Sequence, residues 1–280
     1  MEVTSIAEQL LYTTVRIDTR YAGGATGSGT GFVFIRSVGD DQVPVVVTNK
    51  HVVEGCAGGS ITFTLRDGEL PNIGQGYRLE IDGFSDVWTG HPDPAVDVAV
   101  MPLAPVEVVL NDRGIRVFYR AIASEIVPSE EQIEKLDAFE QLLFIGYPNG
   151  IWDKKNLLPV MRTGTTATPL AVDFEGQPLF LMDASVFPGS SGSPVFLYNP
   201  GMYFSKDGST NLATRLMFVG IVASVYFRDD VNDVVTIPVP TANDRSITVS
   251  REMIDLGQVF KARTIVETID SLIASHGAGL

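Results

Sequence analysis

The most informative segment of this 280-residue sequence reads Asp183-Ala184-Ser185-Val186-Phe187-Pro188-Gly189-Ser190-Ser191-Gly192-Ser193-Pro194. Two glycines flank a pair of serines, and an apolar strand-like run follows directly. Gly189 and Gly192 permit a tight turn in which several backbone N–H groups converge on one point. Such a nest can stabilise an oxyanion, and Ser191 is placed so that its own N–H and that of Gly189 would face the developing charge. Taken alone, the segment also fits an ordinary glycine–serine loop.

Two residues earlier in the chain have contexts that suit proton transfer. His51 directly follows an apolar strand-like run, and the end of a strand holds a side chain rigidly while leaving it reachable. Asp97 is the one acid in the apolar run Val96–Leu103. Burying a carboxylate without a partner is costly, and a histidine N–H is a suitable partner. The alternative is that Asp97 only begins or caps a strand. The other histidines, His91 and His276, lie in a turn and in a glycine-containing tail.

The order of these residues resembles a known family. His51, Asp97 and Ser191 follow one another at separations of 46 and 94 residues, as in the chymotrypsin-like serine peptidases. The resemblance covers residues 5–245 and implies a serine endopeptidase with a Ser191, His51 and Asp97 triad and an oxyanion hole made by the backbone of Gly189 and Ser191. The segments that carry it are Gly27–Phe32, Thr48–Val53, Phe144–Pro148 and Asp183–Phe196, which are most similar to the bacterial HtrA (Deg) and glutamyl-endopeptidase branches.

Two series of short strand signals, with little helix between them, predict an all-β fold. The first series is Thr13–Thr19, Gly31–Ile35, Val43–Thr48, Ser60–Leu65 and Val98–Leu103, and the second is Leu142–Tyr147, Leu157–Thr163, Leu179–Met182, Pro194–Tyr198, Leu216–Tyr226 and Val234–Val239. The family resemblance implies two antiparallel six-stranded β-barrels packed face to face. Helices are expected at Ser5–Leu11, Ser129–Phe139 and Thr264–Ser275, the last as a helix docked on the body.

This pattern divides the chain into three parts. Residues 1–110 are expected to form the N-terminal barrel lobe with His51 and Asp97. Residues 111–262 would supply a linker and the C-terminal barrel lobe with Ser191, and residues 263–280 a closing helix and tail. The remaining tail is too short for the PDZ domain that HtrA proteins append, so a peptidase without a PDZ domain is expected.

The resemblance also suggests where substrate binds. The primary pocket of the family corresponds here to Ser185, Ser224 and Tyr226. Ser185 stands where trypsin-type enzymes carry an acid, and the later strand lacks the histidine of glutamate-specific members. The pocket is therefore expected to be neutral and to take a small or medium apolar residue. Ser190 replaces the aspartate that pairs with a newly cut N-terminus, so restraint by a regulatory protein partner, an oligomer or a mobile loop is expected instead.

Composition limits which partners, disulfides and metal sites are expected. The net charge of −14 disfavours nucleic acid and anionic membrane surfaces as partners. The family resemblance implies a protein or peptide substrate. The single cysteine, Cys56, excludes an intrachain disulfide and a cysteine-rich metal site, and no metal or cofactor is expected. A buried structural thiol is favoured for Cys56 over a second nucleophile. A solvated acidic loop is favoured over calcium ligation for Asp229, Asp230 and Asp233.

The chain start has neither a basic segment nor a long apolar one, and no apolar run reaches the roughly 18 residues of a membrane span. A bacterial, cytoplasmic protein is therefore expected, with no expectation for its oligomeric state. The glycines of Gly27–Phe32 lack the spacing of a nucleotide-binding loop. The alternative to an active endopeptidase is a catalytically weak peptidase-fold binding or chaperone-like module. A third option is a peptidase that is silent until a regulator docks.

Overall fold

The computed structural model describes residues 2–148, 151–187, 189–234 and 246–277, with only the backbone for 227–234, 246–254 and 276–277. In its first half, the elements are α1 (Ile6–Leu10), β1 (Thr14–Arg20), β2 (Thr26–Val38), β3 (Asp41–Thr48), α2 (Lys50–Val53), β4 (Gly58–Asp67), β5 (Leu70–Asp82), β6 (Thr89–Gly90), β7 (Ala99–Pro102), α3 (Ala104–Asp112), β8 (Val117–Phe118) and β9 (Ile122–Ala123). The second half contains α4 (Glu130–Glu134), β10 (Gln141–Gly146), β11 (Val160–Thr166), β12 (Leu179–Asp183), β13 (Pro194–Asn199), β14 (Tyr203–Phe204), β15 (Thr210–Asn211), β16 (Arg215–Val234), β17 (Ser246–Lys261) and α5 (Ala262–Gly277).

The first lobe is built on a nine-stranded sheet. Its strand order is β5-β4-β1-β2-β3-β7-β6, while β8 pairs with β4 and β9 pairs with β2. Among the described residues, this lobe therefore has more strands than the six expected. Strand β5 and the two short strands β8 and β9 were not predicted, because their sequences lack a strong strand signal. Since β8 and β9 come from residues 117–123, the sheet of the first lobe continues past residue 110.

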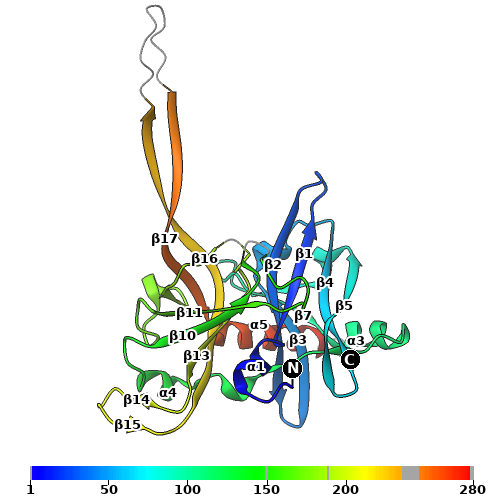
Figure 1. The fold of residues 1–280 in the computed structure, drawn as a ribbon, viewed down its shortest axis with the longest axis horizontal. Coiled ribbons are helices and arrows are strands. Elements are labelled where there is room, and N and C mark those ends of the chain that lie inside the picture. The colour runs from blue at the N-terminus through cyan, green and yellow to red at the C-terminus, as the bar shows by residue number, and fades with distance from the viewer. Residues whose placement is uncertain (1, 149–150, 188, 235–245, 278–280) are drawn as a thin grey trace, which may run out of the picture.

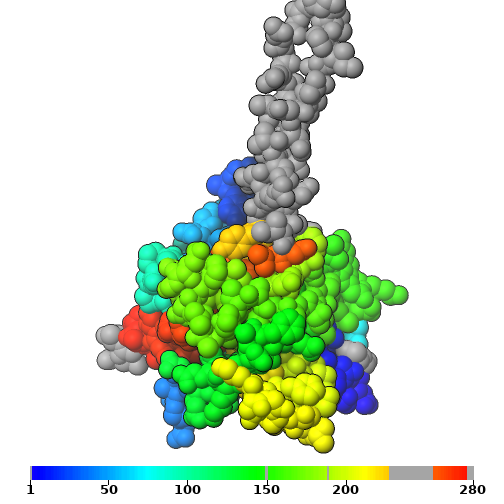
Figure 2. Space-filling model, turned by 90° about the vertical axis from the view of Figure 1, so that its left-hand side faces the viewer, coloured from blue at the N-terminus to red at the C-terminus, as the bar shows by residue number. Residues whose placement is uncertain are grey.

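The second lobe is a closed antiparallel barrel of six strands, β10-β11-β12-β17-β16-β13, as the sequence predicts for this lobe. The predicted strand Val234–Val239 lies almost entirely outside the described residues, and β17 closes the barrel instead by pairing with β12 and β16. Strands β16 and β17 continue beyond the barrel as a long two-stranded arm (Figure 1). Figure 2 faces the second lobe and shows the yellow segment, which includes β14 and β15, at its lower edge.

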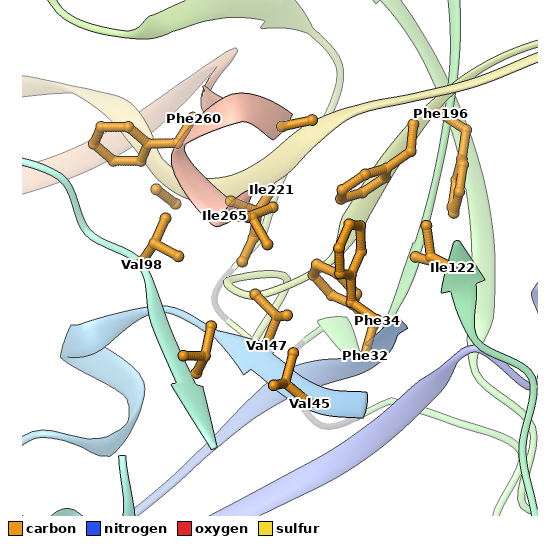
Figure 3. Close-up of a cluster of buried hydrophobic side chains, with 14 of the residues drawn as sticks. Phe32, Phe34, Val45, Val47, Val98, Ile122, Phe196, Ile221, Phe260 and Ile265 are labelled. Carbon is orange, nitrogen blue, oxygen red and sulfur yellow. The ribbon is translucent and has the colours of Figure 1, made fainter. Parts of the chain in front are cut away.

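The two lobes share one hydrophobic core, here called the inter-lobe core. Alternation along β2 directs Phe32 and Phe34 into this core, while Val33 packs into a separate core of the first lobe. From the second lobe, Phe218 meets these aromatic rings, with ring centres 5.4 Å apart for Phe32 and Phe218. Phe196 lies in the same core near Phe32 and Phe34 (Figure 3). A third core fills the interior of the barrel. The lobes are therefore joined by buried apolar side chains rather than by a linker alone.

Helix α5 closes the molecule where the two lobes meet. Ile265, Ile269 and Leu272 lie on its buried face and pack in the inter-lobe core, as the sequence pattern predicts. Helix α4 is shorter than predicted: its capping box forms between Ser129 and Gln132, but the helix ends at Glu134, with Lys135 as its C-cap. Helix α3 was not predicted, because Pro105 and its valines gave no clear helical signal. No helix in the described part of the chain is both long and apolar enough to span a membrane.

Candidate active site

Strand pairing in the first lobe brings His51 and Asp97 together. Thr48 at the end of β3 pairs with Ala99 at the start of β7, so His51 in α2 lies beside the segment that precedes β7. The Nδ1 atom of His51 lies 2.5 Å from Oδ2 of Asp97, and the backbone N–H of His51 donates to Oδ1 at 3.1 Å. About half of the His51 side chain is exposed, which leaves its other ring nitrogen reachable. Asp97 thus orients a histidine that faces solvent.

Two neighbours of His51 hold the loop that carries Asp97. The buried Asn49 donates from Nδ2 to the backbone oxygen of Asp97 at 2.6 Å. Lys50 donates from Nζ to the backbone oxygen of Asp93 at 2.9 Å. Because both bonds come from residues adjacent to His51, the position of the carboxylate is tied directly to the position of the imidazole.

The loop around Ser191 is a tight turn whose two glycines have positive φ. Gly189 and Gly192 both have φ of +87°, which other residues adopt only with strain. Ser190 and Gly192 use their N–H groups in hydrogen bonds to Phe187 and Val222. The N–H groups of Gly189 and Ser191, in contrast, donate to no described residue. These are the two donors that the sequence predicts for an oxyanion hole.

The Ser191 hydroxyl does not contact His51 in this structure. It donates instead to the backbone oxygen of Ala223 in β16 at 3.1 Å. The family resemblance predicts a hydrogen bond from this hydroxyl to the histidine. Rotation about a single side-chain bond of Ser191 changes the direction of the hydroxyl, and catalytic hydrogen bonds often tighten only when substrate is bound.

Thr30 links the Ser191 loop to the first lobe. Its backbone N–H donates to the Ser191 oxygen at 2.9 Å, and its hydroxyl donates to the Gly189 oxygen at 3.1 Å. The same hydroxyl accepts from the N–H of Tyr147 at 3.1 Å. Its backbone oxygen accepts from the Thr48 hydroxyl at 2.8 Å, close to the start of the segment that carries His51. The sequence marked this region only as a glycine-rich strand, and a threonine between two glycines is a weak signal for such a role.

The three predicted pocket residues lie on two elements. Ser185 is half-buried in the segment between β12 and the Ser191 loop, and Ser224 is exposed on β16 with its hydroxyl 2.6 Å from Oε1 of Gln258. Tyr226 packs against the inter-lobe core. Gly257 of β17 lies against the segment that carries Ser185, since a Cβ placed at Gly257 would lie 2.9 Å from the Val186 side chain.

The remaining candidates lie apart from this site. Cys56 is buried, its thiol donates to the backbone oxygen of Val53 at 2.9 Å, and burial raises its pKa. The Nε2 atom of His91 lies 3.1 Å from Oε2 of Glu267 on α5. The described residues contain no group of three or more metal-ligating side chains. The side chains of Asp229, Asp230, Asp233 and His276 lie outside those that the structure describes.

Residues 29–201 match the trypsin-like peptidase domain family. The "Putative serine protease HhoB" of Synechocystis sp. (strain ATCC 27184 / PCC 6803 / Kazusa) is 27% identical over 169 residues, or 60% of this chain and 31% of that protein. The chain therefore spans less than a third of that relative's length.

Two solved structures show the same fold. The HtrA-type protease AlgW with tripeptide matches 97% of this chain and 63% of its own, at 15% identity and a TM-score of 0.51. The serine endoprotease from Yersinia pestis matches 98% and 68%, at 14% identity and a TM-score of 0.50.

Proposed function

Because the chain belongs to the trypsin-like peptidase family, we propose that it is a serine endopeptidase with Ser191 as nucleophile, His51 as general base and Asp97 as the residue that orients His51. One observation carries this proposal. The hydrogen bond between Thr48 and Thr30 has one part of the site on each side. On one side is His51, which is held by a carboxylate. On the other side is the Ser191 loop, in which two N–H groups have no acceptor among the described residues. Nucleophile, base and oxyanion donors are the parts that acyl transfer from a peptide requires.

The mechanism begins with rotation of the Ser191 hydroxyl from the Ala223 oxygen toward His51. The Oγ atom then attacks the peptide carbonyl while His51 accepts its proton through Nε2, because Nδ1 faces Asp97. The tetrahedral oxyanion is held by the N–H groups of Gly189 and Ser191, at about 3 kcal/mol for each donor. His51 gives its proton to the leaving amine. Water hydrolyses the acyl-enzyme by the reverse proton transfers.

We also propose that activity is restrained by a regulatory protein partner rather than by N-terminal cleavage. Ser190 has no charge to pair with a new N-terminal amine. Its hydroxyl is buried and finds no hydrogen-bond partner in the described part of the chain. The loop therefore lacks the ion pair that locks the digestive members of the family in an active state.

The test is covalent labelling with a fluorophosphonate probe, which reacts with activated serines. If the protein is a serine endopeptidase, we expect labelling that Ser191→Ala abolishes and that the matched variant Ser209→Ala, in a surface turn, leaves unchanged. Labelling that requires an added protein would support the restrained form. Cleavage of unfolded substrates at a high rate by the untreated protein would rule out the restraint.

The alternative is a binding or chaperone-like module with little catalysis, which the hydrogen bond from Ser191 to Ala223 favours. This module would show no labelling under any condition. If the protein is such a module, wild type and Ser191→Ala should suppress aggregation of an unfolded client protein equally well. A wild-type protein that labels and degrades the client would exclude it.

A further inference from the structure

Arg162 is a cation beside the Ser191 loop that the proposed mechanism does not use. It lies on β11 directly opposite Phe144 of β10, which is a buried residue of the barrel core. Its guanidinium lies 5.3 Å from the centre of the Phe144 ring and 5.0 Å from that of Phe187. The Nη1 atom is buried and has no hydrogen-bond acceptor among the described residues.

The position of Arg162 places it at the wall of the predicted primary pocket. Phe187 lies midway between Ser185, which lines that pocket, and Gly189, which supplies an oxyanion donor. Strand β11 runs alongside this wall, since Thr165 pairs with Asp183. A Cβ on the intervening Gly164 would lie 2.6 Å from the Asp183 backbone oxygen, so the two segments are in close contact.

The surroundings of the guanidinium offer no acceptor to its buried Nη1 group among the described residues. Two aromatic faces offer cation–π attraction, but they accept no conventional hydrogen bond from the N–H groups. Burial lowers the pKa of Arg162, and the nearby charge of Asp255 opposes that effect. No ion pair joins Arg162 to Asp255 or to another acid in the described part of the chain. A buried Nη1 group without an acceptor is costly, and a carboxylate is the group that matches the planar fork of donors to which Nη1 belongs.

We propose that Arg162 makes the primary pocket selective for an acidic side chain, glutamate or aspartate, on the acyl side of the bond that is cut. This inference rests on the proposed function and names the substrate class of the same site. It departs from the neutral pocket expected from Ser185, Ser224 and Tyr226. Those three residues come from the loop and from β16, whereas Arg162 enters from β11.

The first experiment compares peptides that differ only in the residue before the cleaved bond. Glutamate and glutamine have nearly the same shape, so their ratio of kcat/KM isolates the charge. We expect wild type to prefer glutamate by at least about tenfold, because the pocket would otherwise leave a buried donor unpaired. A smaller ratio in wild type overturns the inference. Aspartate and asparagine peptides form a second matched pair.

Variants of Arg162 test whether this residue causes the preference for glutamate. In Arg162→Met the glutamate preference should be lost, while cleavage after leucine and labelling of Ser191 persist. Arg162→Lys should retain part of the preference, since it keeps the charge without the planar fork. The control is Arg113→Met, an exposed arginine bonded to Tyr77 on the first lobe, which should behave as wild type. A preference that survives in Arg162→Met would overturn the assignment.

A binding experiment separates failure of this inference from failure of the proposed function. Absence of both cleavage and labelling would refute the proposed function. Calorimetry would then use Ser191→Ala protein and product peptides that end in glutamate or glutamine. Tighter binding of the glutamate peptide, lost when Arg162→Met is added, supports an acid-selective pocket. Equal binding of the two peptides overturns it.

Discussion

Thr30 shows how one hydroxyl can hold the Ser191 loop. It donates to the Gly189 oxygen and accepts from the Tyr147 N–H, and both partners belong to the second lobe. Thr30→Val keeps the shape but leaves the Tyr147 N–H and the Gly189 oxygen unpaired. We expect a loss of about 1–3 kcal/mol in the free energy of unfolding and slower fluorophosphonate labelling. Urea unfolding and labelling rates measure the two effects.

Thr30→Ser retains the hydroxyl and is the matched control for this prediction. It should stay close to wild type in labelling rate. If Thr30→Val labels as fast as wild type, the hydroxyl does not position the loop.

Gly192 is required for two separate reasons. Its φ is +87°, and a Cβ at this position would lie 1.8 Å from the Thr30 backbone oxygen. Gly192→Ala should therefore displace the loop and abolish labelling of Ser191. Gly208→Ala is the matched control, because Gly208 has φ of +83° but nothing within 4 Å of the added Cβ. That variant should lose about 1 kcal/mol of stability and label normally.

Equal loss of labelling in both variants would mean that backbone strain, and not the contact with Thr30, explains the glycine. Circular dichroism on both proteins would verify that the fold is retained.

At the scale of elements, an ion cluster fastens α5 to the barrel. Asp173 accepts from Lys261 at 2.6 Å and from Arg263 at 2.5 Å, at the junction of β17 and α5. Burial favours the neutral form of Asp173, but the hydrogen bonds from these two cations outweigh it and lower its pKa. The carboxylate therefore stabilises the fold above its unfolded pKa, and this contribution is lost as the pH falls through the folded pKa.

Asp173→Asn should destabilise the protein by about 1–2 kcal/mol at pH 7, because the buried Lys261 loses a charged partner. The difference from wild type should shrink as the pH falls below about 4, where the carboxylate also becomes neutral in the wild-type protein. Thermal unfolding at a series of pH values measures this. Asp270→Asn, which breaks an exposed pair with Arg36, should have little effect. A pH-independent difference would contradict the prediction.

The pairing of elements also explains the limits of the sequence reading. Strand β17 carries Gly257 and closes the barrel, but its sequence alternates weakly and gave no strand prediction. Helix α4 ends early although its capping box was read correctly, because Leu136 turns into the barrel core. In each case a tertiary contact outweighs a local preference.

At the scale of the whole molecule, the proposed catalytic groups come from two lobes that share one core. Phe218 of β16 is fully buried and contacts Phe32 and Phe34 of β2, as well as Phe196 of β13. Phe218→Ala should destabilise the protein by about 3–5 kcal/mol. It should also lower labelling of Ser191 in the fraction that stays folded, since His51 and Ser191 would lose their common support.

Phe204→Ala is the control, because Phe204 is 64% exposed on β14. Denaturant unfolding followed by tryptophan fluorescence and by labelling compares the two variants. Normal labelling in folded Phe218→Ala protein would show that the inter-lobe core supports stability but not the alignment of the site.

Local sequence patterns, such as two glycines around a serine or an acid entering an apolar strand, draw attention to His51, Asp97 and the Ser191 loop. The order of these residues gives the family resemblance, and the resemblance implies the triad and the barrel of the second lobe. Tertiary structure alone decided three features. Thr30 bridges the lobes, Arg162 approaches Phe187 from another strand, and the Ser191 hydroxyl faces Ala223. These depend on contacts between distant segments and on one side-chain torsion, which no local pattern encodes.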